Sequence, residues 1–332
     1  MKKLINLTMF DLLKGIIMLG VLFGHSIIAP EKGLGLLWYG KIMHSLAMAA
    51  LFIVSGYWLK KKTIKAGVKL GITYLIKPLL LVLLIINVIG FVHRAMAGNL
   101  SEWVELFFVP SLLMWNGPGT RLGPLWFVLA LFWAWCIFYF VVQITGEKLQ
   151  IGIAVLFGVL GGALMPLQLP YQIAPGLMGF FFLYAGYFIK KKKLLEKKVN
   201  PVLLVLMLGV WWLTVVYGSM DFYLYDVKYG ILSAIGSLLG AFLLIKLFLY
   251  VNLLDWRVLD AFGWVGRYSM WYMCIHSVEK AVFPWKILFR FVDQKSMIGI
   301  VALFILRTIM ITVICCVCQK VLMYWNGRKL RG

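Results

Sequence analysis

The chain has 332 residues, of which 63% are hydrophobic and only 14% charged, and its mean hydropathy is +0.94. A soluble domain of this length needs far more polar surface to cover its core, so the composition excludes that class. The net charge of +21 invites a nucleic-acid interpretation, but the basic residues cluster at alternate ends of apolar blocks, as in 60–69 and 190–198. That pattern is typical of the cytoplasmic loops of membrane proteins, which also contact anionic lipid.

The apolar residues form continuous blocks of roughly 17–25 residues, the length that a helix needs to cross a bilayer. Continuous blocks favour helices over a closed barrel, whose strands alternate. We predict an all-α polytopic membrane protein, a bundle of about ten transmembrane helices around a central cavity. Residues 1–332 are expected to form a single domain, with no soluble domain appended. The predicted spans are 8–29, 42–59, 70–92, 124–142, 150–168, 174–190, 201–219, 230–251, 267–284 and 297–320.

The connections between these spans predict the orientation of the chain. A cytoplasmic N-terminus places most of the Lys and Arg outside the spans on the cytoplasmic side, so both termini are predicted to be cytoplasmic. The basic stretches are 1–7, 60–69, 143–149, 191–200, 252–266 and 321–332. On the other side, residues 93–123 contain apolar residues at helical spacing and are expected to form a helix lying at the membrane interface.

The five cysteines all lie inside apolar blocks, where small apolar filling is a better explanation than disulfides or zinc. The four histidines stand on separate segments without a pair four residues apart on one helix. We therefore predict no metal site.

The first apolar block carries charged side chains that hydrocarbon disfavours. Lys14 and His25 are eleven residues apart, which places them on one face of a helix, roughly 16 Å apart along its axis. Each alone has an ordinary explanation, as a lysine that snorkels to the surface or an imidazole bonded to a neighbouring helix. Together they favour a lined cavity. Asp11 stands three residues before Lys14 and can pair with it.

The stretch FDLLKGIIMLGVLFGH resembles the first-helix signature of the membrane-bound acyltransferase family 3, near its fucose 4-O-acetylase-like branch, through Asp11, Lys14, Gly15 and His25. Most of that family has Arg where this chain has Lys14. Three further segments resemble family motifs in the expected order: LFIVSGYWL (51–59), GPLWFVLALF (123–132) and GRYSMWYMCIH (266–276). Relatives in that branch often have His-Met-Pro where this chain has Ala-Met-Ala at 47–49, with His44 one turn earlier; whether His44 substitutes for that histidine is open.

The resemblance implies an O-acyltransferase of the cell membrane that moves an acyl group, usually acetyl from acetyl-CoA, to a hydroxyl of an envelope glycan or glycolipid. His25 is the best candidate for a general base, with His276 and His44 as base partner or substrate orienter. Lys14 would anchor the phosphates of CoA, and Asp11 would pair with it. Acetyl-CoA would be a donor substrate rather than a permanently bound cofactor. The expected partners are acyl-CoA, the acceptor, the bilayer and, since many relatives carry an extracytoplasmic domain, a separate extracytoplasmic transferase.

Other positions have weaker indications. Ser55 could act on substrate or simply allow close helix packing, Trp126 could line the cavity or anchor the helix at the interface, and Arg121 could contact an anionic acceptor or a lipid headgroup. Ser269 shares a helix face with His276, and Lys77 could line the cavity or snorkel. A transporter or flippase, or a non-catalytic assembly or sensor protein on the same scaffold, would fit the same composition.

Overall fold

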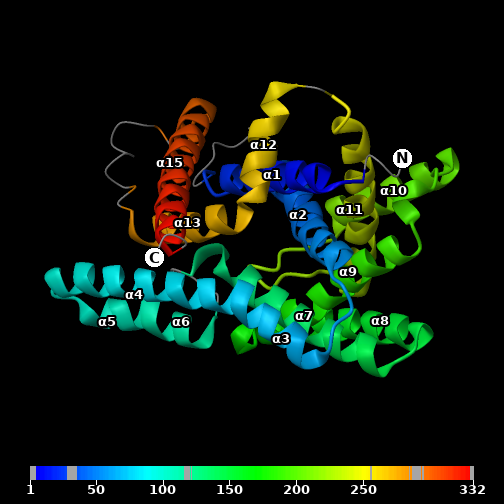
Figure 1. The fold of residues 1–332 in the computed structure, drawn as a ribbon, viewed down its shortest axis with the longest axis horizontal. Coiled ribbons are helices and arrows are strands. Elements are labelled where there is room, and N and C mark those ends of the chain that lie inside the picture. The colour runs from blue at the N-terminus through cyan, green and yellow to red at the C-terminus, as the bar shows by residue number, and fades with distance from the viewer. Residues whose placement is uncertain are drawn as a thin grey trace.

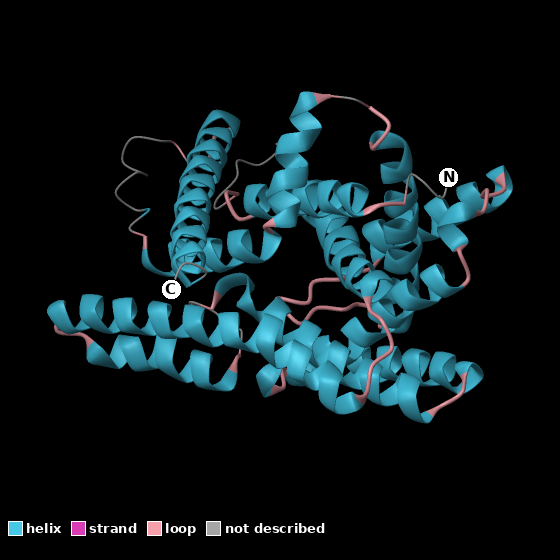
Figure 2. Ribbon diagram, in the orientation of Figure 1, coloured by secondary structure: helices cyan, strands magenta, loops and turns pink. Residues whose placement is uncertain are grey.

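The computed structural model describes residues 5–27, 36–115, 120, 122–254, 256–283, 285, 293 and 295–329. Within them the chain is helical, and its one extended pairing is an isolated bridge between Asp221 and Asp226 (Figures 1 and 2). The α-helices are α1 (Leu7–Gly24), α2 (Leu36–Trp58), α3 (Ile64–Gly71), α4 (Lys77–Met96), α5 (Leu100–Trp103), α6 (Val109–Leu113), α7 (Trp126–Ile144), α8 (Glu147–Leu164), α9 (Ile173–Lys191), α10 (Pro201–Tyr217), α11 (Ile231–Val251), α12 (Arg257–Arg267), α13 (Ser269–Val282) and α15 (Met297–Lys329).

Eight helical stretches in the described part of the chain are long and apolar enough to cross a membrane. They are Leu7–Gly24, Leu36–Trp58, Ile64–Met96, Gly123–Ile144, Glu147–Leu167, Pro170–Lys191, Ile231–Val251 and Met297–Val321. The third includes a π-helical turn, η1 (Ile72–Ile76), between α3 and α4. The fold class is therefore confirmed as all-α and polytopic, with eight membrane-length stretches where the sequence suggests about ten.

The two remaining predicted spans differ from the structure. The span 201–219 corresponds to α10, which is apolar but has only 17 residues. The span 267–284 corresponds to α13, which has only 14 residues, and the connection 252–266, expected on the cytoplasmic side, instead contains most of α12. Tyr268 between them has φ −103° and ψ 20°, which breaks the helix. The 14 residues of α13 rise about 21 Å, short of the ~30 Å hydrocarbon core.

The segment predicted to be an interfacial helix is helical but pairs with α4. Residues 100–113 form α5, a π-helical turn and α6, and they run back beside α4 (Figure 1). The Trp103 Nε1 donates to the Asn87 carbonyl over 3.0 Å, and the Asn87 amide donates to Ser111 over 2.8 Å. These bonds satisfy polar groups that would otherwise face hydrocarbon.

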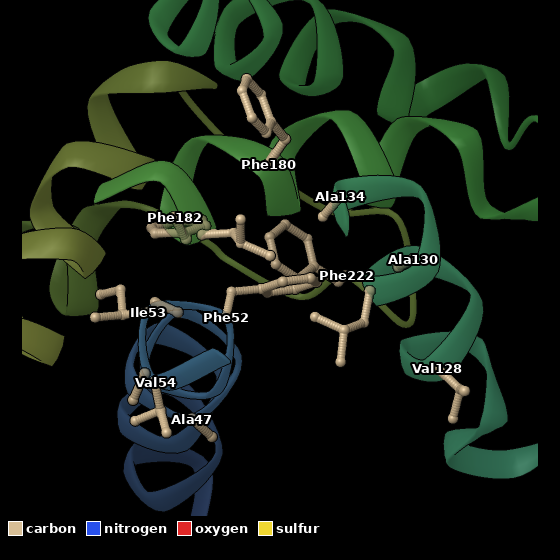
Figure 3. Close-up of a cluster of buried hydrophobic side chains, with 14 of the residues drawn as sticks. Ala47, Phe52, Ile53, Val54, Val128, Ala130, Ala134, Phe180, Phe182 and Phe222 are labelled. Atoms are coloured by element: carbon tan, nitrogen blue, oxygen red, sulfur yellow. The ribbon is translucent and has the colours of Figure 1, made fainter. Parts of the chain in front are cut away.

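The centre of the bundle is an aromatic cluster that joins α2, α7, α9 and the 218–230 loop (Figure 3). Phe52 packs on Phe127 with ring centroids 5.0 Å apart and on Phe222 at 6.4 Å. Phe182 reaches Phe222 from α9 at 6.3 Å. Offset and edge-on contacts of this kind stabilise a core beyond simple burial. The cluster supports one wall of the cavity described below.

Helices α1 and α12 cross at a pair of glycines. A Cβ on Gly15 would lie 1.8 Å from the Phe262 carbonyl oxygen, and one on Gly266 would lie 1.7 Å from the Asp11 carbonyl oxygen. Only glycine permits this approach, which is how helices commonly pack in membranes. Gly15 thus has a packing role, and it brings α12 against the charged end of α1.

Candidate active site

A cavity of about 400 Å³ opens between the C-terminal end of α1, α2, α13 and the 218–230 loop. Its wall is mostly apolar, with Met18 and Val21 of α1 and Trp126 of α7 among the lining residues. Three histidines, one aspartate and one lysine also line it: His25, His44, His276, Asp221 and Lys280. An apolar cavity with a few convergent polar groups is the usual form of a ligand or catalytic site.

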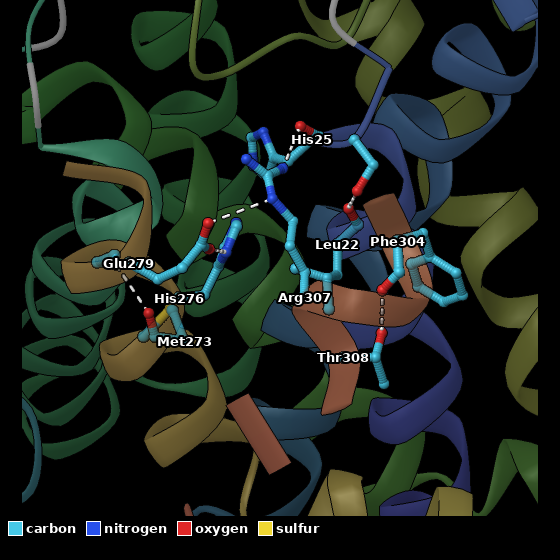
Figure 4. A network of polar contacts seen from close by, with 10 residues as sticks. Leu22, His25, Met273, His276, Glu279, Phe304, Arg307 and Thr308 are labelled. Carbon is cyan, nitrogen blue, oxygen red and sulfur yellow. Dashed lines mark hydrogen bonds and ion pairs between the residues drawn. The ribbon is translucent and has the colours of Figure 1, made fainter. Parts of the chain in front are cut away.

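His25 is placed by the end of α1 and by an arginine from the far end of the chain. Its backbone N–H donates to the Val21 carbonyl over 2.9 Å and so completes the last turn of the helix. Its own carbonyl oxygen accepts a 2.6 Å hydrogen bond from Nη1 of Arg307 in α15. This charge-assisted bond fixes the position of His25 relative to α15 (Figure 4).

The same arginine reaches a second histidine through a buried glutamate. His276 Nδ1 lies 2.8 Å from Glu279 Oε2, and Arg307 Nε lies 3.2 Å from Glu279 Oε1 (Figure 4). The second contact is an ion pair without hydrogen-bond geometry, since neither Arg307 Nε nor Glu279 Oε1 is hydrogen-bonded. His276, Glu279 and Arg307 are only 2%, 4% and 3% exposed. A buried charge pair of this kind persists because each charge compensates the other.

The glutamate determines which nitrogen of His276 carries the proton. An ionised carboxylate only accepts hydrogen bonds, so Nδ1 of His276 must donate to it. In the neutral imidazole Nε2 is then an acceptor, and this buried atom has no hydrogen-bond partner in the described part of the protein. Because His276 lines the cavity, Nε2 is available to a group bound there.

The rings of His25 and His276 lie together, with centroids 5.1 Å apart and planes at 40°. Both residues lie outside the eight membrane-length helices. Burial lowers the pKa of His25 well below its ordinary value of 6.5, and positive charge on Lys280, His276, Arg307 and His44 acts in the same direction. Burial also lowers the pKa of His276 and outweighs the opposite effect of Glu279. Both imidazoles are thus neutral near pH 7, the form that a general base requires.

His44 joins α2 to the 218–230 loop. Its Nδ1 lies 3.0 Å from Asp221 Oδ2, and Asp221 Oδ1 accepts from the backbone N–H groups of Tyr223 and Leu224 at 3.0 Å. Burial raises the pKa of the Asp221 carboxyl, but the bond and charge of His44 together with these backbone donors bring the pKa below its ordinary value. The aspartate is therefore ionised, and it holds the loop against the cavity.

Lys14 lies outside the cavity lining, one helical turn before Met18. Its ammonium nitrogen is 2.9 Å from Asp11 Oδ1, as the three-residue spacing suggests. Arg267 of α12 lies on the other oxygen of Asp11, with Nε 3.7 Å from Oδ2, and its side chain is 63% exposed. The crossing of α1 with α12 therefore places two cations at the end of the α1 face that leads to His25.

Of the other candidate residues, only some line the cavity. Trp126 lines the cavity and packs on Phe222 at 6.0 Å. Ser55 lies outside the lining and accepts a 2.9 Å bond from Trp135, next to Gly56, where a Cβ would come 1.8 Å from the Leu183 carbonyl oxygen. Ser269 and the exposed Lys77 also lie outside the lining. Arg121 lies outside the described residues.

Four cavity or network residues were not among the site residues predicted from sequence: Asp221, Glu279, Lys280 and Arg307. The sequence contains a pattern that could have pointed to three of them. Glu279 and Lys280 follow His276 by three and four residues on one helix, and Arg307 interrupts an apolar run of α15. Asp221 lies in an irregular loop, and its partner His44 is far away in the sequence.

The described residues contain no group of three or more His, Cys, Asp or Glu side chains that could hold a metal ion. A family model described as an acyltransferase domain matches residues 8–319. No curated protein and no solved structure gave a match. The matched residues include α1, α13 and Arg307, and so the whole histidine site. This chain therefore belongs to the membrane-bound acyltransferase family 3 and is a membrane acyltransferase.

Proposed function

We propose that this protein transfers an acetyl group from cytoplasmic acetyl-CoA to a hydroxyl of a cell-envelope glycan or glycolipid. The proposal includes a location in the cell membrane with both termini cytoplasmic. The observation that carries it is the pair His25 and His276, two neutral imidazoles side by side in a 400 Å³ cavity. A sugar hydroxyl is a weak nucleophile, and a neutral imidazole is suited to take its proton.

His25 is the proposed general base. It accepts the proton of the acceptor hydroxyl while the oxygen attacks the thioester carbonyl, and it returns that proton to the departing CoA sulfur. His276 lies beside it and accepts a hydrogen bond from the acceptor at Nε2. Lys280 lines the same cavity and supplies positive charge near the carbonyl oxygen, where negative charge develops.

Lys14 and Arg267 are the proposed contacts for the phosphates of CoA. The guanidinium of Arg267 can bind phosphate through two N–H groups, which Lys14 cannot do. From Lys14 the face of α1 continues through Met18 and Val21 to His25, a distance of roughly 16 Å at helical rise. A thin pantetheine arm along this face would bring the thioester to the histidines.

The test uses purified protein in lipid nanodiscs, acetyl-CoA labelled in the acetyl group, and a glycolipid extract of the source membrane. We expect label in the glycolipid, loss of transfer in His25→Ala, and a raised KM for acetyl-CoA in Lys14→Ala. His93→Ala is the matched control, because His93 is an exposed histidine at the far end of α4. Movement of an intact substrate across the membrane without any labelled product would instead support a transporter.

A further inference from the structure

A second cavity, of about 560 Å³, opens on the side of the bundle between α9, α10 and α11. α10 packs on α11 and on α2, at the edge of the bundle (Figure 1). The groove wall formed by α10 includes Leu203, Leu206 and Val210, which are 50%, 60% and 40% exposed. Phe188 of α9 and Phe242 of α11 complete the apolar lining of this groove.

One end of this groove is basic. Lys197 and Lys198 line it, and both side chains are exposed. The turn that presents them is held by Lys246 of α11, whose ammonium group donates to the Lys197 carbonyl oxygen. Neighbouring lysines are engaged elsewhere, since Lys191 and Lys192 both pair with Glu147.

The apolar part of the groove fits within one membrane leaflet. From Leu203 to Val210 the lining residues of α10 rise roughly 10 Å, which is less than half of the ~30 Å hydrocarbon core. A chain lying in the groove would therefore begin at the two lysines and stay within the leaflet on their side. The lysines then stand at the level of lipid headgroups.

We infer that this groove is a binding site for an anionic phospholipid, with an acyl chain in its apolar part and the phosphate headgroup on Lys197 and Lys198. Basic pockets between membrane helices are a recognised place for such headgroups. Charge complementarity favours phosphatidylglycerol over phosphatidylcholine, whose amine cancels its phosphate charge. The site is separate from the histidine cavity, and this inference does not depend on the transfer reaction.

The test measures how many phosphatidylglycerol and phosphatidylcholine molecules stay bound to the purified protein, by native mass spectrometry at graded lipid concentrations. Wild-type protein should retain one phosphatidylglycerol more tightly than phosphatidylcholine. Lys197→Gln/Lys198→Gln should weaken phosphatidylglycerol binding about 30-fold and leave phosphatidylcholine unchanged. Leu206→Trp, which fills the groove, should weaken binding of both lipids. Inorganic phosphate should not displace the lipid, because it lacks an acyl chain.

The matched control is Lys61→Gln/Lys62→Gln, which removes the same charge from two exposed lysines that do not line the groove. It should bind phosphatidylglycerol as wild type does. If the control variant and the groove variant lost phosphatidylglycerol binding equally, the loss would come from the overall charge of the protein, and the inference would be overturned. Equal retention of both lipids by wild type, or undiminished binding by Leu206→Trp, would overturn it as well. Thermal unfolding in lipid-free detergent checks that each variant is folded.

Discussion

Arg307 donates a 2.6 Å hydrogen bond from Nη1 to the carbonyl oxygen of His25, and so connects the last long helix to the end of the first. Its Nε simultaneously lies 3.2 Å from Glu279, which holds His276. One planar guanidinium thus positions both histidines, and a single point charge could not make both contacts.

Arg307→Lys tests this dual role. The lysine keeps the positive charge but can occupy only one of the two positions, so the histidines lose their common support. We expect kcat for acetyl transfer to fall roughly 10²-fold or more, because a small misplacement of a catalytic group slows a reaction by about this factor. KM for acetyl-CoA should change little. Steady-state kinetics on folded wild-type and Arg307→Lys protein measure both kcat and KM. A rise in KM with unchanged kcat would contradict a positioning role.

Removing one member of the buried ion pair should cost stability. Glu279→Gln leaves the Arg307 charge buried and uncompensated, which should lower the free energy of unfolding by about 3–5 kcal/mol. The double variant Glu279→Gln/Arg307→Met removes the charge as well and should recover part of that loss. Thermal unfolding of Glu279→Gln, Arg307→Met and the double variant in one detergent measures both effects. Strictly additive losses would show that the two residues are not coupled.

The pH dependence of transfer should report the lowered pKa of His25. Protonation inactivates a general base, and since this pKa lies below 6.5, kcat/KM should hold from neutral pH to below 6.5 and only then decline. Burial is the main cause, and Lys280 is the next. Lys280→Met should therefore move the acid limb to higher pH without reaching the position of an exposed histidine. An acid limb at or above 6.5 in the wild type would contradict this account.

The crossing of α1 with α12 should tolerate no methyl group at Gly266. A Cβ there would lie 1.7 Å from the Asp11 carbonyl oxygen, so Gly266→Ala must push the helices apart, at a cost of about 1–3 kcal/mol or more. Gly263→Ala is the control on the same helix, since a Cβ there meets nothing within 4 Å and alanine favours the helix by about 0.5–1 kcal/mol. A thermal unfolding midpoint for Gly266→Ala equal to that of wild type would contradict the close crossing.

The fold class could be predicted because hydrocarbon imposes a simple requirement on length and polarity. The helix α12 was missed, because its eleven residues are too few for a length rule that finds only membrane-spanning helices. The length rule also places no limit on helices that extend past the membrane, as α15 does to Lys329.

The candidate site was only partly predictable for a similar reason. Helical periodicity places Lys14 and His25 on one face, and the structure places their helix against the cavity through Met18 and Val21. Helical periodicity relates only residues of the same helix, so it could not predict that His276 lies beside His25 or that Asp221 lies beside His44. Those contacts come from tertiary packing between segments distant in sequence, and Arg307 was recognisable only as a charge inside an apolar run.

The most direct measurement of the central claim is CoA release from acetyl-CoA by the purified protein, in the presence of membrane glycolipid, for wild type, His25→Ala, Lys14→Ala and the His93→Ala control. We expect turnover in wild type and control, a loss of about 10²–10⁴-fold in His25→Ala, and a raised KM with largely retained kcat in Lys14→Ala. Turnover in His25→Ala equal to that of wild type would contradict the role of His25. A wild-type protein that neither binds nor consumes acetyl-CoA would contradict acetyl transfer from this donor.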